Sequence, residues 1–433
     1  MIAKIKTIDK VPHLLSSRET VTLDAPAFVY LTLELPRAPK VELFVKEGDH
    51  VYFCQKIGVR HGSSFDLPIF STVSGQVLGI EKHTSSSGKP ANFLKVQNDF
   101  KDELDPEAKP RTAEEIAALT KEDVFNIVND FGLTGLGGSG FPTIIKLKSS
   151  EKVDHILLNG VECEPYLNSD QKLMLNHAKE IIEGALILQK IYDCKDVRIC
   201  VKGIHQDIVD HLNEVLAADY KDSGVTVALM KNFYPQGWEV AEIKTALNIE
   251  VASGKLPFAY GVLNLNVATA MSLYRAVALR LPMVERYATI NGDGVAAPKD
   301  FLVRIGTLFT DVLPVVGGYT AEEGLRMSVG GPMMGSTVPN DDVVFSDLVT
   351  NVLVTKDHTV AESPCIRCGS CVLSCPTHLE PVLIMEAVKS NDRDRVKALK
   401  PLSCVECGLC TYVCTSGIRV TDYIRRAKIL AKL

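Results

Sequence analysis

The sequence predicts a multidomain α/β protein, and three observations lead to that fold class. The chain has 433 residues, too many for one ordinary hydrophobic core and enough for about three domains of roughly 150 residues. Short apolar strands alternate with helical segments through the middle of the chain, as in an α/β layer. Eight of the twelve cysteines lie in the last 69 residues, which marks a separate C-terminal unit.

Composition excludes several classes of protein. With 46% hydrophobic and 23% charged residues, the chain has the make-up of a soluble globular protein. A formal charge of -6 and a pI near 6.0 give no basic footprint, so we expect no nucleic-acid partner. The start lacks the apolar core of a signal peptide, and no apolar run approaches the ~18 residues of a membrane span. We therefore expect a cytoplasmic chain that contacts a membrane only through a partner.

Residues 1–108 are expected to form an N-terminal lipoyl-like β-sandwich, a barrel-sandwich hybrid. Short alternating apolar stretches between residues 41 and 79 are broken by Gly, Asp and Ser, which predicts short strands and tight turns. The pieces VKEGDHV and STVSGQV resemble the hairpins of lipoyl and biotinyl domains. Those domains modify a lysine at a hairpin tip, but no lysine lies between Arg60 and Gln76, so we expect the scaffold without a swinging arm.

Residues 109–283 are expected to form an α/β domain, after a charged, proline-bearing linker. The segment EDVFNIVNDFG puts its apolar residues on one helical face and ends at Gly132. The strands DHILLNG, VRICVKG and VTVALMK then alternate with helices, which favours a largely parallel sheet. Short strands and turns predict a small α+β unit at 284–345, and residues 346–433 form the cysteine-rich tail with two helical segments.

The tail carries the strongest motif in the sequence. CIRCGSCVLSCP and CVECGLCTYVCT both read C-x2-C-x2-C-x3-C and lie 39 residues apart. This is the bacterial ferredoxin pattern, in which three close thiolates hold one iron-sulfur cubane and the fourth reaches the other. We assign one [4Fe-4S] cluster to Cys365, Cys368, Cys371 and Cys414, and the second to Cys404, Cys407, Cys410 and Cys375. The alternative, structural zinc, uses separated C-x2-C pairs and fits this spacing poorly.

A glycine-rich loop, LTGLGGSGFPT at 133–143, has four glycines in six positions. An ordinary dinucleotide fingerprint, G-x-G-x-x-G, follows a strand, whereas a helix precedes this loop and its spacing is G-x-G-G-x-G. Its bare amides and the helix that follows suit an anionic group, and Lys146 adds charge. The residues leave two interpretations open, a phosphate cradle and a structural glycine hinge.

Five segments together carry the resemblance. GLGGSGFPTIIKL, LLNGVECEP, YPQGWEVAEIKTAL and the two cysteine repeats resemble the RnfC subunit of Rnf electron-transport complexes. The same core is similar to the NADH-oxidising flavoprotein subunit of respiratory complex I. The resemblance implies a Rossmann-like FMN/NADH-binding domain at 109–283, a β-grasp (SLBB) module at 284–345 and a helical two-[4Fe-4S] ferredoxin domain at 346–433. It also implies non-covalent FMN and NAD(H) as substrate.

The resemblance implies binding roles for the residues of this chain that match the family motifs. The FMN-binding glycine loop is matched by Gly135, Gly137, Gly138, Gly140 and Phe141, followed by Lys146. The polar strand end that faces the flavin ring is matched by Asn159, Glu162 and Glu164. Complex I has an Asp where this chain has Val161, so we expect one flavin contact to be absent or replaced.

The remaining matches concern the nicotinamide and phosphate ends of the ligands. Tyr234, Gly237 and Glu239 match the segment near flavin and nicotinamide, Lys255 matches a nucleotide-contacting lysine, and Asn266 and Thr269 match the segment beside the FMN phosphate. We expect none of the three matched glutamates to act as an acid or base catalyst. Cys163 is expected to be an unreactive, packed thiol.

The resemblance implies a peripheral, NAD(H)-facing subunit of an ion-translocating ferredoxin:NAD+ oxidoreductase, on the cytoplasmic face of the cell membrane. Its partners would be integral membrane and ferredoxin-like Rnf subunits. Two alternatives stay open: a soluble RnfC-like paralogue that serves another reductase, such as a cobalamin reductase or an amino-acid reductase donor, and a cluster-bearing scaffold with an empty flavin pocket. The start KVPHLL fits the Gly-Gly-x-His-Pro of family members poorly, which keeps the paralogue in view.

Overall fold

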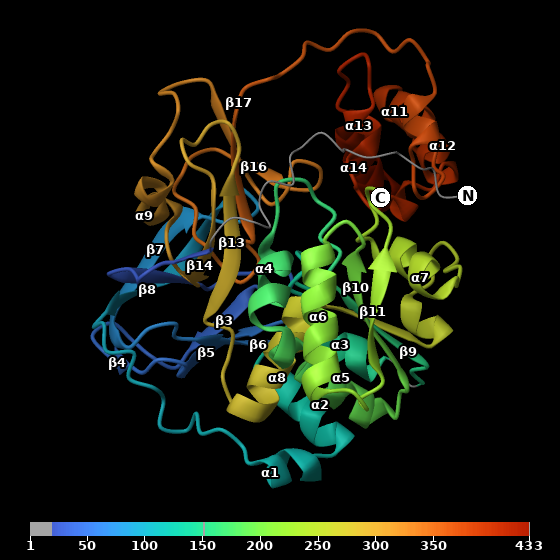
Figure 1. Cartoon of the computed structure of the whole chain (residues 1–433). Helices are drawn as coiled ribbons and strands as arrows, with labels where there is room; N and C mark the ends of the chain where they lie inside the picture. Colours follow the sequence, from blue (N-terminus) through green and yellow to red (C-terminus); the bar gives the residue numbers. More distant parts are fainter. Residues whose placement is uncertain (1–19, 150–151, 433) are drawn as a thin grey trace.

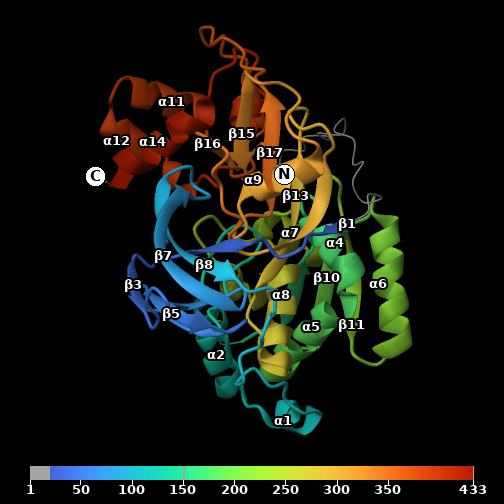
Figure 2. The same cartoon turned by 90° about the vertical axis from the view of Figure 1, so that its left-hand side faces the viewer.

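A computed structural model describes residues 20–149 and 152–432 (Figure 1). Residues 1–19, which include the KVPHLL start and the segment in which we predicted no signal peptide, lie outside the described residues. The described chain forms a β-sandwich, an α/β layer, a mixed sheet and a helical tail. Figure 2 shows the sandwich strands β3, β5, β7 and β8 standing beside the α/β layer.

The β-sandwich expected near the N-terminus is present. One antiparallel sheet has the order β2-β8-β7-β4 and the other β3-β5-β6. Their strands are β2 (Phe28–Thr32), β3 (Lys40–Leu43), β4 (His50–Val51), β5 (Lys56–His61), β6 (Asp66–Phe70), β7 (Gly75–Thr84) and β8 (Pro90–Asn98). Alternating apolar residues such as Val29, Ile57 and Val77 meet in a fully buried core between the sheets.

Two short helices lead into the α/β layer, and both begin at capping boxes. Thr112 caps α1 (Ala113–Ala118) with Glu115, and Thr120 caps α2 (Lys121–Asp130) with Asp123. Helix α2 buries the apolar face predicted for it and is followed by Gly132 at φ +60°. The glycine-rich loop comes next and leads into α3 (Thr143–Lys148), which has only six residues.

The sheet of the α/β layer is entirely parallel, as expected. Its order is β11-β10-β9-β12, with strands β9 (His155–Asn159), β10 (Asp196–Lys202), β11 (Val225–Met230) and β12 (Val262–Asn266). Its helices are α4 (Ser169–Asn176), α5 (Ala178–Tyr192), α6 (Gln206–Asp219), α7 (Glu239–Leu247), α8 (Val267–Tyr274), the 3-10 turn η1 (Pro257–Tyr260) and the π-helical turn η2 (Arg275–Leu279).

Strand order in this sheet fixes where a ligand can bind. After β9 the chain builds outward through β10 and β11, then returns to place β12 on the other side of β9. Such a reversal opens a crevice at the carboxyl ends of the two strands concerned. Asn159 and Asn266 end β9 and β12 and are paired in register, so both lie at that crevice.

A six-stranded mixed sheet follows, in the order β1-β14-β13-β17-β15-β16. It comprises β1 (Thr20–Thr22), β13 (Glu285–Asn291), β14 (Lys299–Arg304), β15 (Leu325–Val329), β16 (Ser336–Val338) and β17 (Asn351–Lys356), with α9 (Phe309–Val312) and η3 (Leu313–Val316). Two of its strands lie outside the expected bounds of 284–345. Strand β1 pairs with β14 from the N-terminal region, and β17 pairs with β13 and β15 beyond residue 345.

The cysteine-rich tail is helical and lies above the carboxyl ends of the parallel strands (Figure 1). It contains α10 (Ser370–Leu373), α11 (Pro381–Lys389), α12 (Arg393–Ala398), η4 (Pro401–Ser403), α13 (Leu409–Tyr412) and α14 (Val420–Lys432). Helices α11 and α14 confirm the two helical segments predicted there, and Ile384 and Ile424 pack in their shared core. In the described ranges, no helix combines the length and apolarity needed to cross a membrane.

Candidate electron-transfer site

A cavity of about 610 Å³ opens at the crevice between β9 and β12. Of the fifteen cofactor-binding residues that the sequence predicts, eleven line it: Gly135, Gly137, Phe141, Lys146, Asn159, Glu162, Glu164, Gly237, Glu239, Asn266 and Thr269. They come from the glycine loop, α3, the ends of β9 and β12, and the starts of α7 and α8. Residues more than a hundred positions apart therefore meet at one site, and its volume suits a large cofactor.

The glycine loop is fixed by α8. The Leu136 amide donates to Thr269 Oγ1 at 3.1 Å, so the loop is tied to the first turn of that helix. A Cβ on Gly137 would lie 3.2 Å from Asn266 Nδ2, so a larger residue would crowd the cavity wall. The loop presents bare backbone to the cavity, which fits a flat, anionic ligand such as FMN. Helix α3 is too short to supply a helix dipole of consequence.

Four predicted residues do not line the cavity. Gly138 adopts φ +98° and gives the loop its turn, while a Cβ on Gly140 would lie 2.9 Å from Leu348. Lys255 is exposed, next to Leu256, which does line the cavity. Tyr234 is buried behind the wall, and its hydroxyl donates to the Cys407 carbonyl at 2.8 Å. Tyr234 therefore joins the α/β layer to the cysteine-rich tail.

The polar ends of β9 and β12 are held by their own hydrogen bonds. Asn159 Nδ2 donates to the Gly237 carbonyl at 2.9 Å, which fixes the loop before α7. Asn266 caps α8 by accepting from the Ala268 amide at 2.8 Å, and its Nδ2 donates to Asp170 at 2.7 Å. The two side chains thus order the wall.

Lys146 is the cation of the cavity wall. Its Nζ donates to the Asn264 carbonyl at 2.7 Å and lies 3.4 Å from Glu239 Oε2. Both Lys146 and Glu239 line the cavity, and their side chains are 29% and 33% exposed. This opposite-charged pair gives the cavity one positive and one negative group at the same place.

The carboxylates of Glu162 and Glu164 accept hydrogen bonds from backbone amides of the protein. Glu162, at φ +38°, accepts from Ser169 Oγ at 2.8 Å and from the amides of Asp170 and Gln171, so it caps the start of α4. Glu164 accepts from the Met333 and Met334 amides at 3.1 and 2.7 Å. Burial raises the pKa of Glu164 to about 7, although these amides favour its ionised form.

Several lining residues escaped the sequence analysis. Asp170, Met334 and Thr350 line the cavity, and no motif pointed to them. Trp238 also lines it and lies in the matched segment YPQGWEVAEIKTAL, but no role was assigned to it. Cys163 also lines it, beside Gly237, whose added Cβ would lie 2.9 Å from the Cys163 sulfur. Burial raises the pKa of the Cys163 thiol to about 11, which agrees with the unreactive thiol we expected.

The tail gathers four cysteine sulfurs from both repeats. Cys375, Cys404, Cys407 and Cys410 all line a small enclosed space of about 20 Å³ between α11, α13 and α14. Four soft sulfurs around one space fit the donor set of a [4Fe-4S] cluster, and three come from the second repeat and one from the first. In the other predicted set, Cys365 and Cys368 are exposed, and the Cys368 sulfur lies 3.4 Å from Ser370 Oγ.

The two sites share a wall. Val405 and Cys407 line the large cavity together with the glycine loop, and Cys407 also belongs to the four-cysteine space. Met333, Tyr234 and Leu409 pack around Cys407 in one buried cluster. A group held by the four cysteines would therefore be a direct neighbour of a ligand in the large cavity.

Comparison with known proteins identifies the family. Residues 10–101 match the RnfC barrel sandwich hybrid domain, 128–275 the Nuo51 FMN-binding domain and 364–418 a 4Fe-4S dicluster domain. One component of the Na(+)-translocating ferredoxin:NAD(+) oxidoreductase complex of Acetobacterium woodii is 34% identical over 379 residues, covering 86% of this chain and 84% of that protein. The chain belongs to the RnfC family.

Other relatives of this RnfC-family chain agree. A component of the proton-translocating ferredoxin:NAD(+) oxidoreductase complex of Clostridium ljungdahlii is 32% identical over 78% of this chain and 74% of that protein. Among solved structures, an NAD+-reducing [NiFe]-hydrogenase in its H2-reduced state superposes with a TM-score of 0.50 at 17% identity. That match covers 74% of this chain and 64% of the hydrogenase chain, and it shows a shared fold.

Proposed function

We propose that this chain is the NAD(H)-oxidoreducing subunit of an Rnf-type ferredoxin:NAD+ oxidoreductase complex. It passes electrons between NAD(H), non-covalent FMN and two [4Fe-4S] clusters. One observation carries the proposal: a single cavity is lined by the glycine loop and also by Cys407. Family membership supports the same assignment, since relatives that match along most of their length belong to complexes of that name.

FMN supplies exchange of electrons in pairs with a nicotinamide and singly with an iron-sulfur cluster. The protein binds and orients it. Gly135 and Gly137 present backbone to the flavin, and Thr269 holds that loop in place. Lys146 and Glu239 give the mouth paired charges, and Trp238 and Phe258 add apolar surface for a stacked nicotinamide.

The two clusters have different places in this scheme. The set Cys375, Cys404, Cys407 and Cys410 adjoins the large cavity and is the flavin-proximal one. The set containing Cys365 and Cys368 is distal and faces solvent, since both sulfurs are exposed. Ile366 and Leu373 in the same repeat are also exposed, at 70% and 75% of their surface. We place the contact with the ferredoxin-like and membrane subunits at this distal face, on the cytoplasmic side of the membrane.

The finer divisions of the fold belong to the same proposal. We assign the sandwich, whose described strands run from Phe28 to Asn98, to the lipoyl-like scaffold predicted for residues 1–108. We assign the FMN domain to a Rossmann-like layer over 109–283. We assign the six-stranded sheet to a β-grasp (SLBB) module that begins at 284. Since β17 completes this sheet, the module ends after Lys356, and the ferredoxin domain follows it.

Anaerobic purification and spectroscopy test the proposal. We expect about one flavin and about eight irons per chain, with bleaching of both chromophores by NADH. Gly137→Val, which points a side chain at Asn266, is expected to lose most of the flavin and to keep the iron. Gly203→Val is the matched control, since Gly203 is an exposed strand-end glycine whose added Cβ would meet nothing closer than 3.8 Å. Flavin-free wild-type protein, or normal flavin in Gly137→Val, would contradict the proposal.

A further inference from the structure

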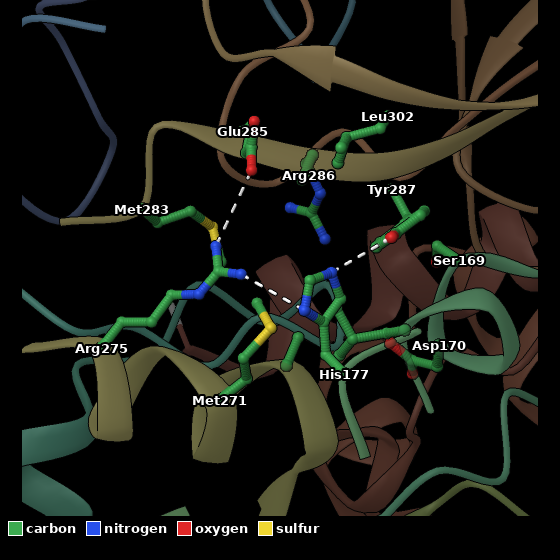
Figure 3. Close-up of a pocket in the computed structure, with 12 residues that line it drawn as sticks. Ser169, Asp170, His177, Met271, Arg275, Met283, Glu285, Arg286, Tyr287 and Leu302 are labelled. Atoms are coloured by element: carbon green, nitrogen blue, oxygen red, sulfur yellow. Dashed lines mark hydrogen bonds and ion pairs between the residues drawn. The ribbon is translucent and has the colours of Figure 1, made fainter. Parts of the chain in front are cut away.

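A second, smaller cavity lies behind the wall of the large one (Figure 3). It has a volume of about 20 Å³ and is enclosed by α4, α8, η2 and β13. Ser169 and Asp170 line both cavities, so they form the partition between them. On the far side the small cavity reaches His177 and Arg275, which keep 21% and 18% of their side-chain surface exposed to solvent.

Arg286 leaves hydrogen-bonding capacity inside this small cavity. The residue is 6% exposed, and Figure 3 shows its guanidinium pointing inward between Tyr287 and His177. Nη2 donates to the Leu136 carbonyl of the glycine loop at 3.4 Å, while Nε and Nη1 have no hydrogen-bond partner among the described residues. Orphaned buried donors of this kind are normally satisfied by ordered water, and the volume suits one water molecule.

We propose that one water in the small cavity joins Arg286 to Asp170, and that Asp170, this water and His177 form a proton route between the large cavity and solvent. The route crosses the partition at Asp170, which accepts one hydrogen bond from Asn266. His177 completes it, because its Nε2 lies 3.1 Å from the Tyr287 hydroxyl and its Nδ1 lies 2.7 Å from the partly exposed Glu180. Arg275 Nη2 also lies 3.4 Å from this Nδ1.

The electrostatic surroundings of Asp170 favour a shared, exchangeable proton. Glu162 and Arg286 are the charged groups that act on Asp170, and Asp347 also acts on Arg286. Glu285, Arg275 and His177 line the same cavity. The buried Lys172–Asp300 pair lies on α4 and β14. Burial raises the pKa of Asp170 and of Glu162, and the charge of Asp170 raises that of Glu162 further. Two buried carboxyls that repel each other hold protons as a unit.

This route adds proton transfer to the proposed function, and it rests on that function because its protons serve the flavin. A bound FMN would accept a hydride from NADH, which brings two electrons and one hydrogen nucleus, and the neutral product would need one further proton. The carboxyl pair gives up that proton and becomes more negative by one charge; a solvent proton entering through His177 restores it. Oxidation runs the same transfer outward. Glu162 and Asp170 thereby gain a proton-handling role that the sequence analysis did not expect of Glu162.

Infrared spectroscopy of the oxidised holoprotein tests the route without turnover. We expect a protonated-carboxyl band that changes in frequency or amplitude in Asp170→Asn, and whose exchange in deuterated water slows by at least about ten-fold in His177→Phe and His177→Gln. His155→Phe is the matched control, because His155 also lies 2.6 Å from a carboxylate, Asp196, and lines neither cavity.

Each result decides the route. Wild-type exchange in both His177 variants, or an unchanged band in Asp170→Asn, overturns it. A high-resolution crystal structure adds an independent readout, since the route requires an ordered water within hydrogen-bond distance of Arg286 Nε or Nη1 and of Asp170. Failure of the proposed function is separate, because it appears as missing flavin or missing reduction by NADH in the same preparation.

Discussion

The two cysteine repeats have the same spacing, yet they lie in opposite surroundings. In the first repeat Cys365 and Cys368 are exposed, whereas in the second Cys407 is 7% exposed and lines the large cavity. The difference comes from outside the repeats. Tyr234 and Met333 pack on the second repeat, while no comparable cover lies over Cys365 and Cys368 in the described chain. A symmetric motif thus gains an inner and an outer end from its contacts, which gives electron flow a direction in space.

Cysteine substitutions give the largest expected effect. Cys407→Ser and Cys368→Ser should each lose about half of the iron, because each removes one ligand of one cluster. Only Cys407→Ser should also lower the flavin content, since only Cys407 lines the large cavity. Iron and flavin analysis of the anaerobic proteins measures this. Equal flavin loss in both variants would remove the distinction between the repeats.

A glycine follows the second cysteine of each repeat, and the two glycines differ in their surroundings. Gly369 and Gly408 occupy equivalent positions with φ +79° and +77°, so alanine costs about 1 kcal/mol of backbone strain at either site. A Cβ on Gly408 would also lie 2.5 Å from the Met333 carbonyl oxygen, whereas Gly369 has open space. We expect Gly408→Ala to lower the free energy of unfolding by about 2–4 kcal/mol and Gly369→Ala by about 1. Chemical unfolding followed by cluster absorbance would show it, and equal losses would contradict this account.

The sequence predicted much of the fold, but it did not predict the different burial of the two cysteine repeats. Residue spacing predicted two cysteine sets that each borrow one ligand from the other repeat, and Cys375 does line one space with Cys404, Cys407 and Cys410. The set of Cys365, Cys368, Cys371 and Cys414 stays a prediction. The alternation of strands and helices predicted the parallel sheet, and the helical spacing of apolar residues predicted α11 and α14. The burial of Cys407 depends on Tyr234, 173 positions away, and no local pattern encodes that contact. The expected end of the third domain at 345 likewise missed β17, whose pairing partners are distant in the chain.

Acidic side chains in the site were the least predictable. Motif matching placed Glu162 and Glu164 at the flavin, yet both accept backbone amides of the protein. Asp170 was missed, because its role follows from lining two cavities at once, a property of packing. Similarity to a family predicts where a residue lies in the site, but only the fold shows which groups it hydrogen-bonds.

Glu164 lines the large cavity and also holds Met333, which packs on the second repeat. Because Glu164 is titratable, the pH dependence of stability offers another test. Glu164 holds the Met333 amide, and Met333 packs on Gly408. With a folded pKa of about 7 against an ordinary value of 4.5, folding favours the protonated carboxyl. The contribution of this carboxyl to the free energy of unfolding is fully present below about pH 4.5 and is lost as the pH rises to about 7. After allowing for partial exposure, we expect that loss to be about 1–2 kcal/mol. Glu164→Gln should flatten this slope in denaturant titrations. An unchanged slope would exclude Glu164 as its source.

Removal of one hydroxyl should have a smaller effect. Tyr234→Phe deletes the 2.8 Å hydrogen bond to the Cys407 carbonyl, which we expect to cost about 1–2 kcal/mol because that acceptor is buried. Tyr412→Phe is the control, since Tyr412 is 55% exposed and lies on the outer surface of the tail. Thermal unfolding of the tail compares them. Equal midpoints would mean that Tyr234 does not secure the inner repeat.

The smallest effect is expected at the outer end. Ile366→Ser, beside Cys365, should change the free energy of unfolding by less than about 0.5 kcal/mol, because its side chain is 70% exposed. Flavin and iron contents should also stay at wild-type values. A large loss of iron or stability would show that the outer repeat is covered in the native protein.

Rapid-mixing spectroscopy of the two cysteine variants tests the central claim most directly, namely that the cluster site containing Cys407 is the one next to the flavin. NADH is mixed with anaerobic Cys368→Ser and Cys407→Ser proteins, each reconstituted with flavin and carrying its one remaining cluster. We predict that the cluster remaining in Cys368→Ser is reduced at close to the wild-type rate, and that the cluster remaining in Cys407→Ser is reduced at least about a hundred-fold more slowly. Fast reduction in Cys407→Ser with slow reduction in Cys368→Ser would contradict the account.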